Sequence, residues 1–323
     1  MGTVLHPYKF KPQLKTVLWG GEKIIPLKGI DSDLQKVGES WEISGVPGHE
    51  SVVAEGPDAG KTLSQLIREY KGRLVGRPVY EKYGDMFPLL IKIIDAAGDL
   101  SVQVHPDDAL AKKRHNSLGK TEMWYIIDAE SGAKIYAGLS SLINPDGYTR
   151  LVKEKKIMDV VACHDSHPGD VFFLPAGRIH AIGAGNLLAE IHETSDITYR
   201  VYDFDRRDAD GNLRQLHTEE AKDAIDYHVY PDYKTDYDRN AEGMTELVEC
   251  SHFDVRRVTV KDTFDMTSEK DSFIVVMCVE GGCEMTTDGD TVTKIGTFDT
   301  VLIPASVKSI KFKGDAVLLT ATV

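Results

Sequence analysis

Two short stretches of the sequence, about 129 positions apart, follow the same pattern. Residues 169–180 read GDVFFLPAGRIH and residues 298–309 read FDTVLIPASVKS, so an aspartate, a proline and an alanine recur at matching places. Each stretch is a short apolar run that enters a proline-containing turn and continues into a second run, which is typical of two consecutive strands. A repeated strand–turn–strand unit predicts a mainly β protein that contains two related β-barrels.

The rest of the chain agrees with this fold class. Apolar, β-branched runs bounded by turn residues predict strands, as at Val171–Leu174, Ile274–Val279 and Val301–Ile303. Helical periodicity is rarer, and we expect the few helices to lie in or beside the first barrel. The expected helices span 61–70, 107–115, 145–155 and 218–225, the last with Thr218 as its N-cap.

The two copies of the repeat differ at their ends. His180 closes the first copy, whereas Ser309 holds the matching place in the second, and no histidine follows His252. The polar sequence NAEG at 240–243 is a reasonable boundary. We therefore expect residues 1–240 to form the catalytic domain with its helical insertions, and residues 241–323 to form a domain of the same type that lacks metal ligands.

Charge and composition limit the possible partners. The 323-residue chain has a net charge of −13, which disfavours nucleic acid and anionic membranes as partners. A phosphorylated small molecule remains possible, because a local Arg/Lys pocket can outweigh charges beyond the screening length of roughly 8 Å. No apolar run approaches the ~18 residues of a membrane helix, and no secretory signal opens the sequence, so we expect a cytoplasmic protein. Its four cysteines have no metal-site spacing and are expected to be free thiols.

Several polar residues interrupt the strand-like runs at places where a metal site could form. Gln103 and His105 share one face of a strand, Glu122 opens another, and His180 opens a third. Each residue alone is as well explained by a satisfied strand-end histidine or a surface ion pair. Together, nitrogen and oxygen ligands from three strands are typical of a catalytic metal site with open positions, although zinc, iron, manganese and cobalt all accept such ligands.

Charged residues near this group point to an anionic or polyhydroxyl ligand. Lys120 precedes Glu122 by two residues, and Glu190 lies in a later strand-like run. Asp196, Thr198 and Arg200 alternate, so on a strand they would share a face, and the guanidinium of Arg200 would offer a planar fork to a phosphate. An alternating strand with its polar face in water is the other interpretation.

Six motifs together resemble one family, type I mannose-6-phosphate isomerase in its shorter bacterial form. The resemblance runs from about residue 7 to residue 227 and rests on VLWGG, GESWEISGVPGHES, QVHPDD, KTEMWY, PAGRIHAIG and TSDITYRVYDFDR. It implies a cupin fold, that is, jelly-roll β-barrels, with one catalytic metal that is usually zinc. One departure is Gly119, where longer members often carry a histidine proposed for proton transfer.

The resemblance also implies site residues. The positions that match metal ligands are Gln103, His105, Glu122 and His180, of which short bacterial forms often use only the two histidines and the glutamate. The positions that match the catalytic pocket are Arg200, Lys120, Glu190 and Asp196, and those expected to bind substrate are Lys92, Lys120 and Arg200. His192 is expected to be a pocket-wall or solvated residue.

We therefore expect a metal-dependent aldose–ketose isomerase that interconverts mannose 6-phosphate and fructose 6-phosphate through a cis-enediol. The partner would be the sugar phosphate alone, and the protein would be a monomer or a weak homo-oligomer. A cupin isomerase of another sugar phosphate and a non-catalytic sugar-binding cupin are the alternatives. The carboxylates Glu190 and Asp196, Lys120 and a metal-bound hydroxide are all candidates for the general base.

Overall fold

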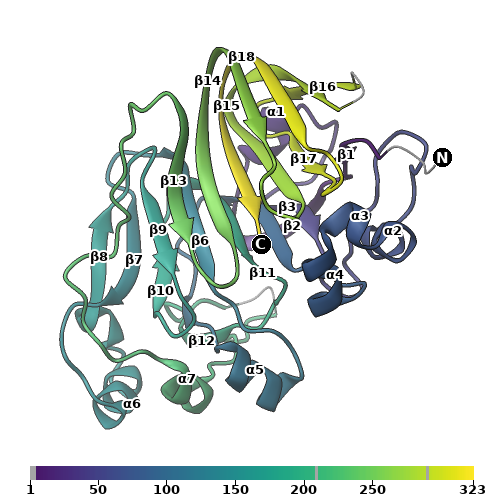
Figure 1. Ribbon diagram of the computed structural model, residues 1–323. Helices are drawn as coiled ribbons and strands as arrows, with labels where there is room; N and C mark the ends of the chain where they lie inside the picture. The colour runs from purple at the N-terminus through teal and green to yellow at the C-terminus, as the bar shows by residue number, and fades with distance from the viewer. Residues whose placement is uncertain (1–4, 208–209, 289–290) are drawn as a thin grey trace.

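The computed structural model describes residues 5–207, 210–288 and 291–323, and within them the strands form three sheets (Figure 1). A six-stranded antiparallel sheet lies in the middle of the molecule. Its order is β2-β3-β4-β11-β6-β9, with bounds Gln13–Gly21, Val37–Ser44, Leu89–Ala96, Asn186–Glu193, Glu122–Ala129 and Val171–Leu174. Every residue of β4 and β11 is buried, because both faces of this sheet are covered.

A five-stranded sheet covers one face of the middle sheet. Its order is β12-β5-β10-β7-β8, with bounds Tyr199–Tyr202, Val102–Val104, His180–Ile182, Lys134–Leu139 and Val161–Asp165. Side chains of both sheets, among them Trp124 of β6 and Ile182 of β10, meet in one hydrophobic cluster. These two sheets facing each other form the predicted first jelly roll, and its interior also contains the polar residues of the site.

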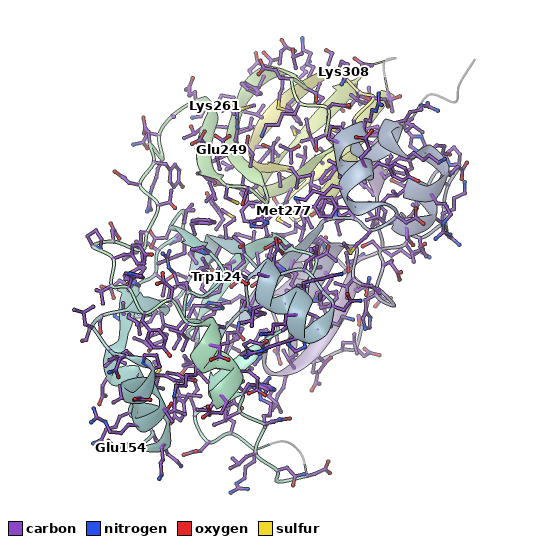
Figure 2. All side chains as sticks on the ribbon, turned by 60° about the horizontal axis from the view of Figure 1, so that its bottom comes forward. Trp124, Glu154, Glu249, Lys261, Met277 and Lys308 are labelled. Carbon is purple, nitrogen blue, oxygen red and sulfur yellow. The ribbon has the colours of Figure 1, made fainter. Side chains whose placement is uncertain are left out.

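A seven-stranded sheet covers the opposite face of the middle sheet. Its order is β1-β17-β15-β18-β14-β13, with β16 paired to β15, and the bounds are Tyr8–Lys9, Thr300–Ile303, Ile274–Thr287, Ser309–Thr322, Asp254–Thr267, Gly243–Glu249 and Thr291–Gly296. Met277 of β15 and Ile191 of β11 belong to a hydrophobic cluster that joins the two parts of the molecule. Figure 2 shows Met277 at the junction and Trp124 inside the other half.

The N-terminal strand β1 also belongs to this last sheet. Strand β1, near the N-terminus, pairs with β17, so that Tyr8 lies opposite Leu302. Strand β13 begins at Gly243, close to the expected boundary. The division of the chain into 1–240 and 241–323 stays a prediction, because β1 belongs by its hydrogen bonds to the C-terminal sheet.

The expected helices are present with small changes at their ends. The described helices are α1 Ile24–Lys28, α2 Leu63–Tyr70, α3 Gly72–Val75, α4 Arg77–Tyr83, α5 Asp108–His115, α6 Pro145–Lys153, the 3₁₀ helix η1 Ile157–Val160 and α7 Thr218–Ala224. Thr62 caps α2 in a capping box with Gln65. The assignment of Thr218 as an N-cap was wrong: it is the first helical residue, and the cap position holds His217, without a side-chain hydrogen bond.

The sequence repeat corresponds to a real structural repeat. In the first copy β9 turns into β10, and in the second β17 turns into β18. Asp170 and Asp299 have equivalent contacts. Each accepts a hydrogen bond from the backbone N–H three residues earlier, and Asp170 pairs with Lys234 as Asp299 pairs with Lys9. The first residue of the second strand is His180 in one copy and Ser309 in the other, as the alignment predicted.

Two general expectations can be compared with the described residues. None of the helices there is long and apolar enough to cross a membrane. The four cysteines are free thiols: Cys163 is exposed, Cys250 is half-buried, and Cys278 and Cys283 are buried.

Candidate active site

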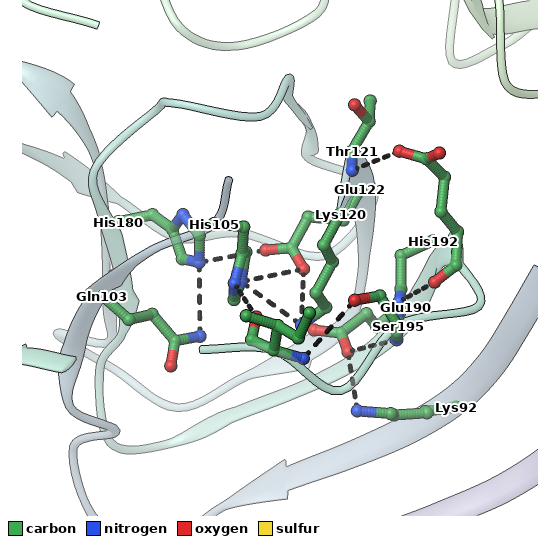
Figure 3. A network of polar contacts seen from close by, with 12 residues as sticks. Lys92, Gln103, His105, Lys120, Thr121, Glu122, His180, Glu190, His192 and Ser195 are labelled. Carbon is green, nitrogen blue, oxygen red and sulfur yellow. Dashed lines mark hydrogen bonds and ion pairs between the residues drawn. The ribbon is translucent and has the colours of Figure 1, made fainter. Parts of the chain in front are cut away.

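Three strands bring His105, Glu122 and His180 together inside the first jelly roll (Figure 3). His105 follows β5 directly, Glu122 is the first residue of β6, and His180 is the first residue of β10. The Nε2 atom of His180 lies 3.0 Å from Oε1 of Glu122, and Nε2 of His105 lies 3.5 Å from Oε2 of the same carboxylate. All three residues are at most 1% exposed.

Strand register and turn geometry produce this convergence. Gln103 of β5 lies directly opposite His180 of β10 on one side and opposite Arg200 of β12 on the other. The turn before β10 is fixed by the N–H of Gly177, which donates to the carbonyl of His105 at 2.9 Å. The proline turn of the repeat therefore holds one histidine against the strand end that carries the other.

Both histidines are set up as metal ligands by their other ring nitrogen. Nδ1 of His105 donates to the carbonyl of Ile197 and Nδ1 of His180 to that of Arg178, each at 2.8 Å. Because a carbonyl can only accept, Nδ1 carries the hydrogen and Nε2 of the neutral ring presents a lone pair to the site. Burial lowers the pKa of both imidazoles, to about 3 for His180, which keeps them neutral as metal ligands must be.

Glu122 supplies the clearest sign that a cation belongs here. Its carboxylate is fully buried, and neither oxygen has a well-aligned hydrogen bond within the described residues, although Nζ of Lys120 lies 3.0 Å from Oε2. Burial raises the pKa of Glu122 to about 7 against the opposing effect of Lys120. A buried carboxylate without full pairing is costly, and a divalent cation held with the two Nε2 atoms would satisfy it. The residues present therefore fit a divalent metal.

Gln103 lies beside this group. Its amide nitrogen is 3.2 Å from Nε2 of His180. Rotation of the amide by half a turn would exchange the positions of its nitrogen and oxygen. The oxygen, which can bind a metal, would then face Nε2 of His180. Gln103 lies close enough to act as a fourth ligand, and this role stays a prediction.

Next to the histidines lies a buried network of opposite charges. Nζ of Lys92 is 3.1 Å from Oε1 of Glu190 and 3.4 Å from Oε2 of Glu39, and the indole N–H of Trp124 donates to Oε2 of Glu190 at 3.0 Å. Burial alone would raise the pKa of Glu190, but Lys92 and Lys120 outweigh it and lower that pKa well below its usual range. Glu190 is therefore an ionised carboxylate.

His192 completes the network from the same strand. It is fully buried, so the solvated interpretation was wrong. It does not line the cavity described below, so the pocket-wall interpretation stays a prediction. Its Nδ1 donates to the carbonyl of Glu193 at 2.7 Å, and its Nε2 lies 3.3 Å from Oε1 of Glu190. Burial lowers the pKa of His192 to about 3.

A cavity of about 190 Å³ opens beside the metal-ligand group. Its walls include the expected residues Lys92, Gln103, Lys120, Glu190 and Arg200, together with Trp19, Glu39, Ser101, Thr198 and Arg214. One N–H of Arg200 donates to the carbonyl of Gln215 at 2.9 Å, whereas its buried Nε has no partner among the described residues. The cavity therefore offers several cationic groups and an unused guanidinium donor to an anion.

Asp196 is not part of this cavity. The sequence interpretation placed it on a strand with Thr198 and Arg200, but β12 begins only at Tyr199, and Asp196 is exposed in the preceding loop. Alternation along a strand therefore does not extend to it. No hydrogen bond or ion pair joins its carboxylate to the other candidates within the part of the chain that the structure describes.

The structure also adds residues that sequence reasoning missed. Glu39 lies within a motif that was noted only as a resemblance, GESWEISG, and its carboxylate is one of the partners of Lys92. Arg214 lines the cavity and is held by the buried carboxylate of Asp203, to which Arg206 also binds. Nothing in the pattern of residues 205–216 predicts that Arg214 folds back onto the site.

A larger cavity of about 420 Å³ lies in the C-terminal sheet, far from these groups in the sequence. Its two cationic residues, Arg256 and Lys270, are both paired with Asp254, and Asp265 and Glu269 add further negative charge. The smaller cavity is therefore the better candidate, since it has both ligating groups and unpaired donors.

Comparison with known proteins decides the family. Two family descriptions match the chain: Phosphomannose isomerase type I, catalytic domain, over residues 8–132, and Mannose-6-phosphate isomerase, cupin domain, over residues 243–323. Mannose-6-phosphate isomerase ManA of Bacillus subtilis (strain 168) is 36% identical over 322 residues, which cover 96% of this chain and 97% of that protein. The chain belongs to the type I mannose-6-phosphate isomerase family. The resemblance read from the six motifs is thereby confirmed.

Other members of the family and solved structures agree. The mannose-6-phosphate isomerase of Streptococcus mutans is 33% identical over 98% of both chains. The crystal structure of the mannose 6-phosphate isomerase from Bacillus subtilis superposes with a TM-score of 0.88 at 31% identity, covering 98% of this chain and 99% of that one. The expected cupin fold, mainly β with a few helices, is confirmed.

Proposed function

We propose that this family member interconverts mannose 6-phosphate and fructose 6-phosphate through a cis-enediol. One observation carries the proposal: a buried His–Glu–His group suited to a divalent metal stands next to a cavity with Lys92, Lys120 and Arg200 in its wall. A sugar phosphate needs cationic groups for its phosphate, and an isomerase needs positive charge where the enediolate oxygens form.

The metal in this proposal is one Zn²⁺ held by His105, Glu122 and His180, with Gln103 as the fourth ligand. Mixed nitrogen and oxygen ligands that leave room for substrate are typical of catalytic zinc. When bound, a divalent cation supplies Lewis-acid stabilisation to the oxygens of the enediolate. Lys120, whose Nζ is 3.0 Å from Glu122 and 3.3 Å from Nε2 of His105, sits between this group and the cavity.

Glu190 is proposed as the group that takes the proton from C2 and returns it at C1. It is ionised, it lines the cavity, and Trp124 and Lys92 fix its two oxygens, so it meets a substrate carbon in one orientation. Because its pKa is low, Glu190 is a weak base. The surrounding cationic groups compensate for this weakness by stabilising the enediolate. Arg200 and Lys92 bind the enediolate or phosphate oxygens, and Asp196, exposed in its loop, has no role in this scheme.

The test is turnover of mannose 6-phosphate to fructose 6-phosphate, measured on the purified protein before and after a chelator and again after adding Zn²⁺ or another divalent ion. We expect activity that disappears with chelation and returns with the metal. A folded, metal-loaded protein that does not isomerise the substrate would contradict the proposal. Glucose 6-phosphate in the same assay tests the alternative of another sugar phosphate, and ligand binding without turnover would indicate a binding module.

The remaining expectations are also proposals. We infer a cytoplasmic enzyme whose only partner is the sugar phosphate, acting as a monomer or a weak homo-oligomer. The free thiols are compatible with a reducing compartment. Size-exclusion chromatography with light scattering measures the oligomeric state directly.

A further inference from the structure

His252, in the C-terminal part of the chain, contacts two carboxylates that lie beside the site. This residue lies in the turn between β13 and β14, which the N–H of Cys250 closes by donating to the carbonyl of Phe253 at 2.9 Å. Phe253 is buried in the shared hydrophobic cluster and packs edge-on against the ring of Phe173 at 6.5 Å between centroids. The position of His252 is therefore fixed by the core that joins the two parts of the molecule.

His252 contacts two carboxylates of the first jelly roll. Its Nδ1 lies 2.9 Å from Oε1 of Glu193, at the end of β11, and 4.0 Å from Oδ2 of Asp108, at the start of α5. Lys82 of α4 contributes further positive charge to the same two carboxylates. The side chain of Glu193 is only 6% exposed, so its contact with His252 is shielded from water and salt more than a surface ion pair.

The two carboxylates hold the segment that carries Lys120. The second oxygen of Glu193 accepts the backbone N–H of Thr121 at 2.8 Å, and Oδ1 of Asp108 accepts that of Gly119, also at 2.8 Å. The N–H of Lys120 itself donates to the carbonyl of Pro106 at 3.2 Å. Residues 119–121 precede β6, and a fourth bond, from the N–H of Glu193 to the carbonyl of Thr121 at 3.2 Å, joins these three in holding their backbone.

This segment leads directly into the site. Thr121 stands between Lys120 and Glu122 in the sequence, and Figure 3 shows the three side by side, with Thr121 bonded away from the site while Lys120 and Glu122 point into it. A shift of the Thr121 amide would move the ammonium of Lys120 and the carboxylate of Glu122 together. Displacements of about 1 Å at such groups can cost about 100-fold in rate.

We propose that His252 is a positioning residue. It holds Glu193, which in turn fixes the backbone of Thr121. Lys120 and Glu122, on either side of Thr121, are thereby oriented toward the substrate and the metal. The C-terminal domain would thus contribute to catalysis by holding a backbone amide of the first domain in place. His252 is its one histidine in the sequence, and none of the proposed metal ligands belongs to this domain. The kinetic part of this inference rests on the proposed isomerase function, whereas its structural part does not.

The experiment compares the full-length variants His252→Ala and His252→Asn with the wild-type protein and with His228→Ala. Asparagine carries an amide N–H close to the place of Nδ1 and can still donate to Glu193. His228 is a matched control, because its side chain is 85% exposed and its ion pair is with Asp226, which is not among the residues of the site. For each protein we measure kcat and KM for mannose 6-phosphate, the dissociation constant for Zn²⁺ and the thermal midpoint.

We expect His252→Ala to lower kcat about 10-fold and weaken Zn²⁺ binding about 10-fold, the range seen for residues that orient metal ligands. His252→Asn should recover most of both losses, and His228→Ala should change neither. If His252→Ala lowers only the thermal midpoint, while kcat and Zn²⁺ affinity stay at the wild-type values, the residue is merely structural and the inference is overturned.

A double variant tests the route through Glu193. In the background of Glu193→Gln, the further change His252→Ala should have little additional effect on kcat or Zn²⁺ affinity, because both changes break the same link. Additive losses would show that His252 does not act through Glu193. If the wild-type protein has no isomerase activity, the proposed function fails, and the Zn²⁺ measurements still decide the structural part of the inference.

Discussion

At the scale of single residues, Lys92 and Glu190 form a buried ion pair whose loss should lower stability. The side chains of Lys92 and Glu190 are 9% and 4% exposed, and removal of one partner leaves the other charge buried without its counterion. We expect Lys92→Met to lower the free energy of unfolding by about 3 kcal/mol. Lys134→Met is the control, because the ion pair of Lys134 with Asp165 is exposed to solvent and should contribute little to stability. Urea unfolding at pH 7 measures both.

The same variant changes the response to acid. Lys92 and Lys120 hold the pKa of Glu190 down, so its contribution to stability is present above the ordinary carboxyl pKa of about 4.3 and is lost as pH falls through the lowered folded value. Without Lys92, the effect of burial on Glu190 is opposed less and its folded pKa rises. The loss of stability that Glu190 contributes in acid should therefore be smaller in Lys92→Met and should end at a higher pH, and an unchanged acid limb would show that Lys92 does not control Glu190.

A site residue could be predicted from the sequence where a local pattern of strands and turns determines its position. Gln103, His105, Glu122 and His180 lie at strand ends next to recognisable turns, and the structure brings them together. Asp196 was placed by extending an alternating pattern past the start of β12, where the backbone is already a loop. Glu39 and Arg214 reach the cavity through tertiary contacts from distant strands and turns, and no local pattern reports such contacts.

At the scale of elements, Gly119 explains why this chain departs from its longer relatives before Lys120. A Cβ atom at this position would lie 2.6 Å from the backbone nitrogen of Asp108 and 2.8 Å from the carbonyl carbon of Asp107. The first turn of α5 therefore occupies the space that any larger residue needs. A histidine at 119 would require the helix to begin elsewhere, so proton transfer in this enzyme has to use another group.

A direct test is Gly119→Ala. Because the obstructing atoms are backbone, they cannot rotate away, and we expect a loss of about 1–3 kcal/mol in the free energy of unfolding together with lower turnover. Gly98→Ala is the control, since a Cβ there would meet Trp19 at 3.6 Å, an ordinary contact. Equal stability of the two variants, by thermal unfolding, would contradict this explanation.

Elements were predictable where local chemistry decides them. The capping box of α2 and the cap of α5 by Asp107 are local, and both helices begin within two residues of the expected place. The length of β15 was not predictable: the apolar run ends at Val279, but the strand continues to Thr287 because its partners β16 and β18 continue. Pairing with β16 and β18 therefore extends β15 beyond its run of apolar residues.

At the scale of the whole molecule, the shared core couples the two parts. Trp19, Trp41 and Trp124 all lie in the first part, so tryptophan fluorescence reports its unfolding alone. We expect Phe253→Ala, in the C-terminal part, to lower the stability measured by fluorescence by about 3–5 kcal/mol, because it empties a place in the common core. Val292→Ala, at an exposed position of β16, should leave it unchanged. If Phe253→Ala leaves the midpoint of the fluorescence transition unchanged, the two parts unfold independently.

The pairing of β1 with β17 sets an order of events when the chain is made. Tyr8 leaves the ribosome early, yet its partner Leu302 follows almost the whole chain later. At about 5–20 residues per second, the wait is roughly 15–60 s. During that time β1 lacks its partner β17, although the carbonyl of Lys9 can already accept the N–H of Ala54, and the face of the middle sheet that the C-terminal sheet covers is open. The architecture of the protein is therefore complete only once the strands β13 to β18 have been made, and the position of Tyr8 depends on strands that are synthesised long after it.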